Sequence, residues 1–181
     1  PLDAGGVLTL HAGGPATLAA TEPSRLAHFW STTPVARAEH TEHPAGRHLV
    51  GPEGWAVSGS REASFATWFA DATCDGCNVT LMRVERDTPG NRGRAHTHSA
   101  EELIVVIDGE IHLGAHALPA GTAVHIPADT RYAVTCGARH HAFLNYRAGP
   151  STQHYVGDAH PVPETALGRG GRLVDATRPR P

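Results

Sequence analysis

Short stretches in which apolar and polar residues alternate dominate the second half of the chain. Residues 103–113 (LIVVIDGEIHL), 131–136 (RYAVTC) and 141–147 (HAFLNYR) are rich in β-branched and aromatic residues, and turn residues separate them. Side chains alternate between the two faces of a β-strand, so such runs predict strands with one buried face. Short strands with a turn signal between successive runs are typical of a β-sandwich or β-barrel. The pattern therefore predicts an all-β domain.

Asp-Gly pairs at 75–76 and 108–109 are predicted to form hairpin turns within such runs. A two-residue type I′ turn needs positive φ at both central positions, which aspartate and glycine tolerate. The first pair lies within residues 64–85 and the second within residues 103–113. We therefore expect each of these stretches to fold as two antiparallel strands.

Cys74 and Cys77 flank the first of these turns and form a C-x-x-C pattern. Such a pair can act as a redox centre or as half of a zinc site. The sequence has neither the βα context of a thioredoxin-like motif nor a second C-x-x-C that would complete a zinc cage. We interpret the pair as two thiols at the end of a hairpin.

The first 60 residues show less periodicity. Residues 7–11 (VLTLH) predict a short strand, and residues 21–30 combine a capping-type threonine with a proline at the expected first turn of a helix. Three histidines fall in AEHTEHPAGRH, a segment punctuated by Pro and Gly. No strand or helix pattern orients their rings, so a polar loop is favoured over a metal site for His40, His43 and His48.

The length of 181 residues corresponds to one domain with extensions. The 20 Gly and 14 Pro indicate many turns and favour a globular all-β protein over a long-helical one. We predict an extension with short strands or one helix over residues 1–60 and a barrel over residues 61–147. Residues 148–181, in which Pro, Gly and Arg are frequent, are predicted to form an extended C-terminal tail.

Charge and hydropathy exclude several classes of partner. The formal net charge of −3 gives no basic excess, so neither nucleic acid nor an anionic membrane surface is expected as a partner. No apolar run approaches the roughly 18 residues that would suggest a membrane span. The three cysteines do not make a disulfide framework, and we expect a cytoplasmic protein.

His96, His98 and Glu102 form an H-x-H-x3-E pattern that predicts a metal site. Alternate side chains of a strand share a face, so both imidazoles can point the same way. Two imidazoles and one carboxylate are the set that binds a divalent metal and leaves coordination positions open, which suits catalysis. Glu101 competes for the carboxylate role, but the parity of the strand favours Glu102 unless a bulge intervenes.

The surrounding sequence resembles the cupin superfamily, including its RmlC-like members. The first cupin signature, G-x5-H-x-H-x3-E-x6-G, is matched at every fixed position from Gly90 to Gly109. The resemblance covers roughly residues 78–147. It implies an antiparallel β-barrel of jelly-roll topology (a double-stranded β-helix), a metal held inside the barrel and a homodimer. It does not imply one reaction, because cupins include oxygenases, isomerases, lyases and non-catalytic binders.

The second cupin signature, G-x5-P-x-G-x2-H-x3-N, is matched only in part. Its proline falls on Pro127, but Asp129 stands at the glycine, Tyr132 at the histidine and Cys136 at the asparagine. Tyr132 therefore stands where many cupins carry their fourth ligand. A phenol can donate a hydrogen bond to a bound oxyanion or act as a general acid or base, and it can equally fill core space. His125 or water are the other candidates for the fourth ligand.

The resemblance and the triad together predict a metal-dependent enzyme that acts on a small organic substrate. Catalytic roles are expected for Tyr132 and Glu102, and Met82, Phe143 and Tyr146 are expected to line the barrel. Fe(II) is the favoured ion, with Zn, Mn, Ni or Cu as alternatives. Oxygenase chemistry is placed ahead of Lewis-acid lyase or isomerase chemistry, and a non-catalytic small-molecule or metal-binding cupin is the rival from another class. A metal-independent sugar-nucleotide epimerase fits less well, because the His-His-Glu set is intact.

Overall fold

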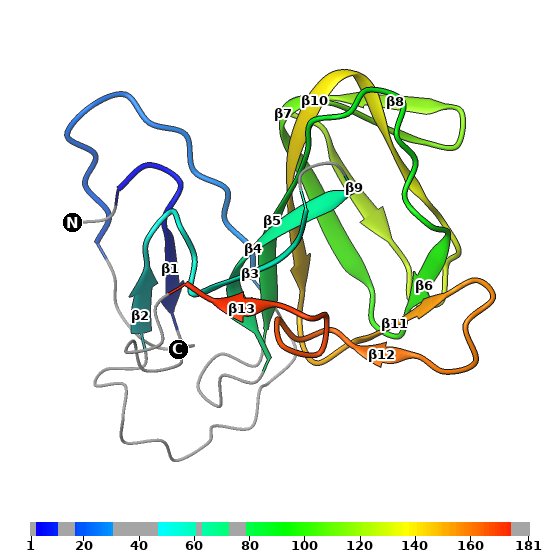
Figure 1. Cartoon of the computed structure of the whole chain (residues 1–181). Coiled ribbons are helices and arrows are strands. Elements are labelled where there is room, and N and C mark those ends of the chain that lie inside the picture. Colours follow the sequence, from blue (N-terminus) through cyan, green and yellow to red (C-terminus); the bar gives the residue numbers. More distant parts are fainter. Residues whose placement is uncertain (1–2, 11–16, 31–46, 61–62, 73–78, 175–181) are drawn as a thin grey trace.

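The chain folds into antiparallel β-strands, as Figure 1 shows for the computed structural model. The structure describes residues 3–10, 17–30, 47–60, 63–72 and 79–174. Within these ranges no helix is present, so the predicted all-β class is confirmed. The helix expected over residues 21–30 is not formed, because Leu26 and Trp30 are exposed and offer no packed apolar face to stabilise a helix. The turn at residues 75–76, Cys74, Cys77, His40 and His43, and the side chain of His48, lie outside what the structure describes.

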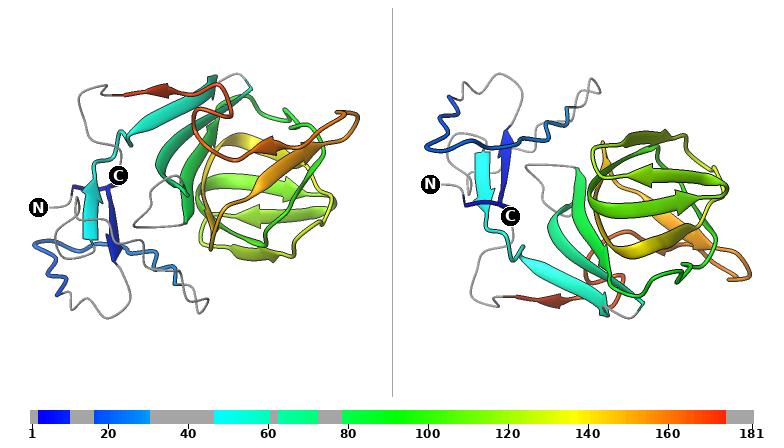
Figure 2. Two further views of the ribbon diagram at one scale, coloured as in Figure 1. Left: turned by 90° about the horizontal axis from the view of Figure 1, so that it is seen from below. Right: turned by 90° about the horizontal axis from the view of Figure 1, so that it is seen from above.

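The largest sheet has eight strands in the order β13-β3-β4-β5-β10-β7-β8, with β9 paired to β7 beside β8. All its pairings are antiparallel. Its strands are β3 (Ala56–Ser60), β4 (Ser64–Asp71), β5 (Thr80–Arg86), β7 (Glu102–Leu113), β8 (His116–Pro119), β9 (Ala123–Ile126), β10 (Val134–Arg147) and β13 (Arg172–Leu173). The end-on views of Figure 2 show β7, β8 and β10 curving around a shared interior.

A smaller sheet, β12-β11-β6, closes another side of this interior. It consists of β6 (His96–His98), β11 (Thr152–Tyr155) and β12 (Val162–Pro163). The segment after residue 147 contributes strands to both sheets, because β11 pairs with β6 and β13 pairs with β3. Edge strands expose unpaired backbone groups, and the C-terminal segment supplies the partners that β6 and β3 need. Separately, β1 (Val7–Leu10) pairs with β2 (Arg47–Val50).

The Asp108–Gly109 pair is not a hairpin turn, contrary to the sequence prediction. Strand β7 runs through it, and the register of β7 against β10 shifts next to it. Gly109 has a φ of +64°, and an added Cβ would lie 1.9 Å from the carbonyl oxygen of His140. The glycine thus permits a β-bulge, a feature that also uses a positive φ. The chain reverses instead between β7 and β8, where Gly114 has positive φ.

Two apolar clusters fill the interior and meet at the half-buried Val84. One is centred on Trp68 and Met82 from β4 and β5, and the other combines Phe143 of β10 with strand residues such as Ile104. Tyr146 was expected beside Phe143, but it belongs to neither of the two clusters. It lies an odd number of positions away on β10 and stacks on Phe29, with ring centroids 4.9 Å apart.

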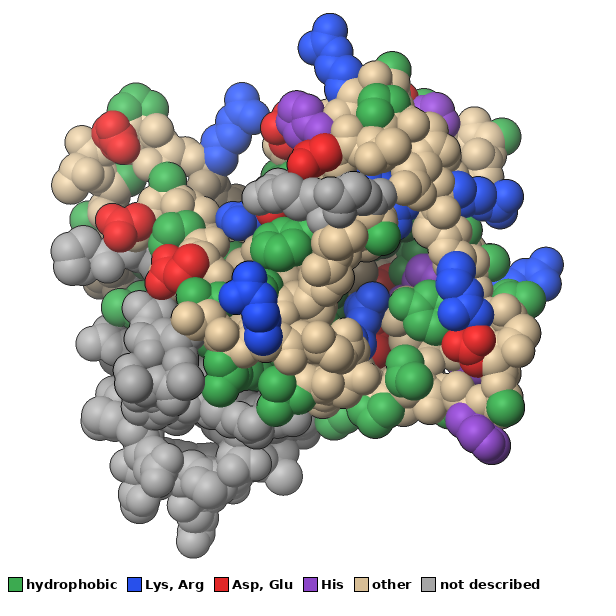
Figure 3. Space-filling model, viewed as in Figure 1, with side chains coloured by type: hydrophobic (Ala, Val, Ile, Leu, Met, Phe, Trp, Pro, Cys, Tyr) green, Lys and Arg blue, Asp and Glu red, His purple; other side chains and the backbone are tan. Residues whose placement is uncertain are grey.

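Charged side chains of both signs are scattered over the face of the molecule drawn in Figure 3. None of the described residues forms a helix long and apolar enough to cross a membrane.

Acid is expected to destabilise the fold through His141, which is 1% exposed. Burial, together with the nearby Arg86, lowers the pKa of His141 to about 4. This folded-state pKa lies below the usual value of about 6.5. The neutral ring therefore contributes stability that is present above a pH of about 6.5 and is lost as the pH falls toward 4. The free energy of unfolding should decrease by up to about 1.4 kcal/mol per pH unit across this window.

Urea denaturation between pH 7 and pH 4 measures this dependence. His141→Gln should flatten it, because glutamine does not titrate. His140→Gln is the matched control, since the neighbouring His140 is exposed and pairs with Asp108 at the surface. Equal pH dependence in wild type and His141→Gln would contradict the assignment.

Candidate functional site

The predicted metal ligands enter the interior from two neighbouring strands. His96 and His98 lie on β6, and Glu102 is the first residue of β7. Along β7 the residues Glu102, Ile104 and Val106 are buried, whereas Leu103 and Ile107 are exposed. This alternation places Glu102 on the inner face, as the parity of the sequence predicted.

Tyr132 is held beside the histidines by backbone pairing. The amide and carbonyl groups of His96 and Tyr132 exchange hydrogen bonds of 2.9 and 3.0 Å. The preceding turn is fixed by a 2.8 Å bond from the Asp129 amide to the carbonyl of His98. Asp129 has a φ of +60°, a conformation that glycine adopts most easily. The cupin signature carries glycine at this position, and aspartate also tolerates it here.

The contacts of His98 fix which ring nitrogen carries the proton. Its Nε2 lies 3.0 Å from Nη2 of Arg147 and 3.1 Å from the hydroxyl of Tyr132. Arginine can only donate, so Nε2 of His98 must accept. The proton is then on Nδ1, which donates to Oε2 of Glu164 over 2.8 Å. A carboxylate thus orients the imidazole and leaves a lone pair on Nε2.

His96 has the same arrangement with a backbone partner. Its Nδ1 lies 2.8 Å from the carbonyl oxygen of Arg94 and therefore carries the proton. Burial is the main cause that lowers the pKa of His96 to about 4, so the ring is neutral at pH 7. The ring centroid lies 4.8 Å from that of His98 and 4.6 Å from that of Tyr132. Nε2 of His96 is left as an acceptor.

Glu102 is 1% exposed and is bound on one oxygen only. Its Oε2 accepts hydrogen bonds from Nη2 of Arg147 (2.5 Å) and Nδ2 of Asn145 (2.8 Å). The same oxygen lies 3.8 Å from Nε2 of His98. Oε1 of Glu102 is buried and has no hydrogen-bond partner among the residues that the structure describes.

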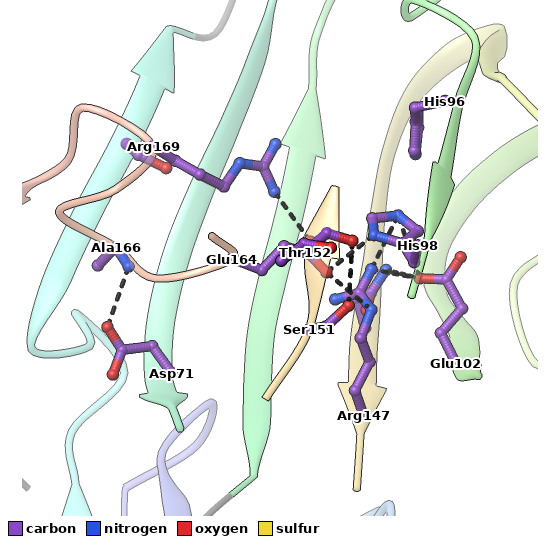
Figure 4. A network of polar contacts seen from close by, with 12 residues as sticks. Asp71, His96, His98, Glu102, Arg147, Ser151, Thr152, Glu164, Ala166 and Arg169 are labelled. Carbon is purple, nitrogen blue, oxygen red and sulfur yellow. Dashed lines mark hydrogen bonds and ion pairs between the residues drawn. The ribbon is translucent and has the colours of Figure 1, made fainter. Parts of the chain in front are cut away.

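Glu164 lies on the side of this network away from Glu102, as Figure 4 shows. Its Oε2 also lies 3.1 Å from Nε of Arg147, and its Oε1 lies 3.6 Å from Nη1 of Arg169. Burial alone would raise the pKa of Glu164, but the hydrogen bond from His98 and the charge of Arg147 lower it to about 2. Glu164 is therefore an anion at neutral pH.

Tyr132 is a neutral phenol in this setting. Burial is the main cause that raises its pKa well above the ordinary value, and the negative charge of Glu102 adds to it. A protonated hydroxyl can donate a hydrogen bond to an oxyanion.

The structure separates the remaining candidates from this site. His125 is half exposed, and its Nε2 lies 2.9 Å from Oε2 of Glu101, which is also exposed. His125 therefore does not stand beside His98 as a fourth ligand, and Glu101 does not replace Glu102. His125 pairs with the outward-facing Leu103 of β7, and Glu101 directly precedes the inward-facing Glu102. The alternation of side chains along a strand therefore places both His125 and Glu101 on the outer surface.

The donor atoms of His96, His98 and Glu102 suit a divalent ion. In this structure, however, the guanidinium of Arg147 lies against two of these side chains. Two unprotonated Nε2 atoms and an unpartnered carboxylate oxygen are suitable ligands. Among the described residues, however, no group of three or more His, Cys, Asp or Glu side chains is arranged to hold a metal ion. The guanidinium of Arg147 contacts both His98 and Glu102 instead.

Three residues of the site were missed by sequence reasoning: Asn145, Arg147 and Glu164. The first two lie on β10 at alternate positions after Phe143, and all three of these side chains are buried. Their parity in HAFLNYR was a usable signal. Glu164 had no local signal, because it lies outside the motif and 66 positions after His98.

A cleft of about 330 Å³ opens on the other side of Glu164. The residues of β11 and the adjoining loops line it, together with the end of β4. They are Asp71, Ala72, Ser99, Pro150, Ser151, Thr152, Pro163, Glu164 and Thr165. Glu164 thus borders this cleft, and its carboxylate also contacts His98.

No family model and no curated protein matches the chain. Solved structures that resemble it include an RmlC-like cupin protein from Ralstonia eutropha JMP134, with 16% identity over 55% of this chain and 66% of that chain, and a TM-score of 0.46. The polyketide cyclase RemF from Streptomyces resistomycificus has 20% identity over 57% and 81% of the two chains, and a TM-score of 0.48. A sugar phosphate isomerase from a cupin superfamily, from Silicibacter pomeroyi DSS-3, has 20% identity over 66% and 82%, and a TM-score of 0.46. Two of these three structures are described as cupins.

Proposed function

We propose that the chain is a metal-dependent cupin enzyme that acts on a small organic molecule, with His96, His98 and Glu102 as the ligands of one divalent ion. The observation that carries this proposal is that both imidazoles are held in the same tautomer, with Nε2 as the unprotonated nitrogen. Each has its Nδ1 proton committed, one to the Arg94 carbonyl and one to the Glu164 carboxylate. Metal-binding histidines are commonly oriented by this kind of outer hydrogen bond.

A bound Fe(II) ion would supply open positions for a substrate and dioxygen, whereas Zn, Mn, Ni or Cu would supply a Lewis acid. We favour oxygenase chemistry because two histidines and one carboxylate are the ligand set of non-haem iron oxygenases. The chain's own groups have separate tasks. Tyr132 remains protonated and donates a hydrogen bond to an oxygen anion of the substrate, and Glu164 keeps His98 in the required tautomer.

The second candidate is a metal-free site, as in a small-molecule binder or an acid–base lyase or isomerase. The contacts of Arg147 with His98 and Glu102 favour it, because a guanidinium already neutralises the carboxylate. Metal content separates the two candidates directly. The expectation of a homodimer stays a prediction in either case.

His96→Ala and His98→Ala are expected to lose most of the bound metal while the barrel stays folded. Backbone pairing with β11 holds β6 in place, and neither substitution changes that pairing. Elemental analysis of protein purified without nickel resin gives the metal content, and circular dichroism gives the fold. His125→Ala is the matched control, since His125 is a strand histidine that faces solvent. If both site variants bind as much metal as wild type, the metal proposal is wrong. If wild type itself binds no metal after loading with each candidate ion, the second candidate is favoured.

A further inference from the structure

We infer that the guanidinium of Arg147 is a built-in cation of this site, so that Arg147 and a divalent metal ion compete for Glu102 and His98. This inference rests on the metal-dependent function proposed above and concerns how that site is regulated. The metal-free chain then holds a closed network, and metal binding requires Nη2 of Arg147 to withdraw.

Arg147 contacts two of the three side chains that a metal would bind. Nη2 lies 2.5 Å from Oε2 of Glu102 and 3.0 Å from Nε2 of His98, and those two acceptor atoms are 3.8 Å apart. The side chain is 1% exposed, so the interior holds it in place. Figure 4 shows the guanidinium between His98, Glu102 and Glu164.

Arg147 and a metal ion cannot share these atoms without a large repulsion. Arginine stays charged inside proteins, so it cannot relieve the repulsion by losing a proton. Charges a few ångströms apart in a buried site interact strongly, because little water screens them. Occupancy by one cation therefore weakens the binding of the other.

The network also offers Arg147 a second position. Its Nε lies 3.1 Å from Oε2 of Glu164, and its Nη1 is buried without a hydrogen-bond partner. Glu164 lies on the side away from Glu102 and borders the cleft. Arg147 can thus keep its pair with Glu164 when Nη2 leaves Glu102.

Metal affinity of the Arg147→Met variant tests the competition. Methionine keeps much of the side-chain volume and removes the charge. Zn²⁺ is the probe, titrated into metal-free protein by calorimetry and checked by equilibrium dialysis. We expect Zn²⁺ to bind roughly 5–150-fold more tightly to Arg147→Met than to wild type, the usual range of coupling between two ligands. Arg169→Met is the matched control, because Arg169 approaches Glu164 and no contact joins it to His98 or Glu102. Its affinity should rise far less than that of Arg147→Met, because Arg169 acts on His96 only through its charge.

The outcomes separate this inference from the proposed function. Equal Zn²⁺ affinity in wild type and Arg147→Met overturns the competition and leaves the metal site intact. An equal gain in Arg169→Met also overturns it, because any loss of positive charge would then suffice. Failure of every variant and of wild type to bind Zn²⁺, Mn²⁺ or Fe²⁺ overturns the metal site itself, and the competition with it.

A second variant keeps the test decisive if Arg147→Met does not fold. Arg147→Met/Glu164→Gln removes one charge of each sign, and glutamine retains an oxygen that can accept from Nδ1 of His98. Its reference is Glu164→Gln alone. Tighter Zn²⁺ binding in the double variant than in this reference supports the competition, and equal binding overturns it.

Discussion

Replacing Glu102 by alanine is expected to lower the free energy of unfolding by roughly 3–5 kcal/mol, the usual result of removing one partner from a buried ion pair. The carboxylate is the acceptor for both Arg147 and Asn145. Its loss leaves Nη2 of Arg147 without an anion in an interior that water does not reach. Glu164 remains beside Nε, so the network is weakened and not removed.

Glu101→Ala is the matched control for this prediction, because it changes the preceding residue of the same chain segment. Glu101 is exposed and pairs with the exposed His125. Surface ion pairs of this kind contribute about 0–1 kcal/mol. Urea denaturation of both variants in the presence of a chelator measures the two effects without a contribution from bound metal. Equal losses in Glu101→Ala and Glu102→Ala would contradict the buried network.

The side of β7 on which Glu102 lies was predictable from sequence, and the reason is geometric. Apolar residues at 104 and 106 had to face a core, and the two-residue period of a strand carries Glu102 to the same face. The same rule sent Glu101 outward. Local alternation therefore identified the motif residues that enter the interior.

The turns and the N-terminal helix were less predictable, because each local signal has more than one solution. Positive φ at Gly109 is compatible with a hairpin turn and with a bulge, and only the partner strand β10 decides between them. Residues 21–30 carry helix-start signals, but a helix needs a surface on which to pack. Among the ring contacts of the described residues, the stacking of Phe29 on Tyr146 is the one that joins this segment to β10.

The charge network of the site depended on long-range pairing that the sequence does not display. Arg147 follows the inward parity of β10, but an arginine at the end of a strand is ordinarily read as a surface residue. Glu164 reaches His98 only because β11 pairs with β6 and β12 pairs with β11. The residues of the predicted triad were thus visible in sequence, whereas Glu164 carried no local signal.

Tyr132→Phe is expected to lower turnover by roughly 10²–10³-fold on the substrate that the wild-type chain converts, the usual contribution of one hydrogen-bond donor to an oxyanion. Phenylalanine keeps the ring that packs beside His96 and removes only the hydroxyl, which lies 3.1 Å from Nε2 of His98. Metal content and the urea midpoint should therefore change little. The rate, the metal content and the midpoint are measured on the same preparation.

Tyr132→His is the companion variant, because it restores the residue that the cupin signature carries at this position. An imidazole there adds a neutral nitrogen ligand beside His96 and His98, so metal should bind more tightly than in wild type or in Tyr132→Phe. Turnover should still fall, since the hydroxyl is missing and a ligand takes a position that substrate would use. Wild-type turnover in Tyr132→Phe would reduce Tyr132 to a packing residue. Unchanged metal affinity in Tyr132→His would mean that the ring at position 132 does not face the ion held by His96, His98 and Glu102.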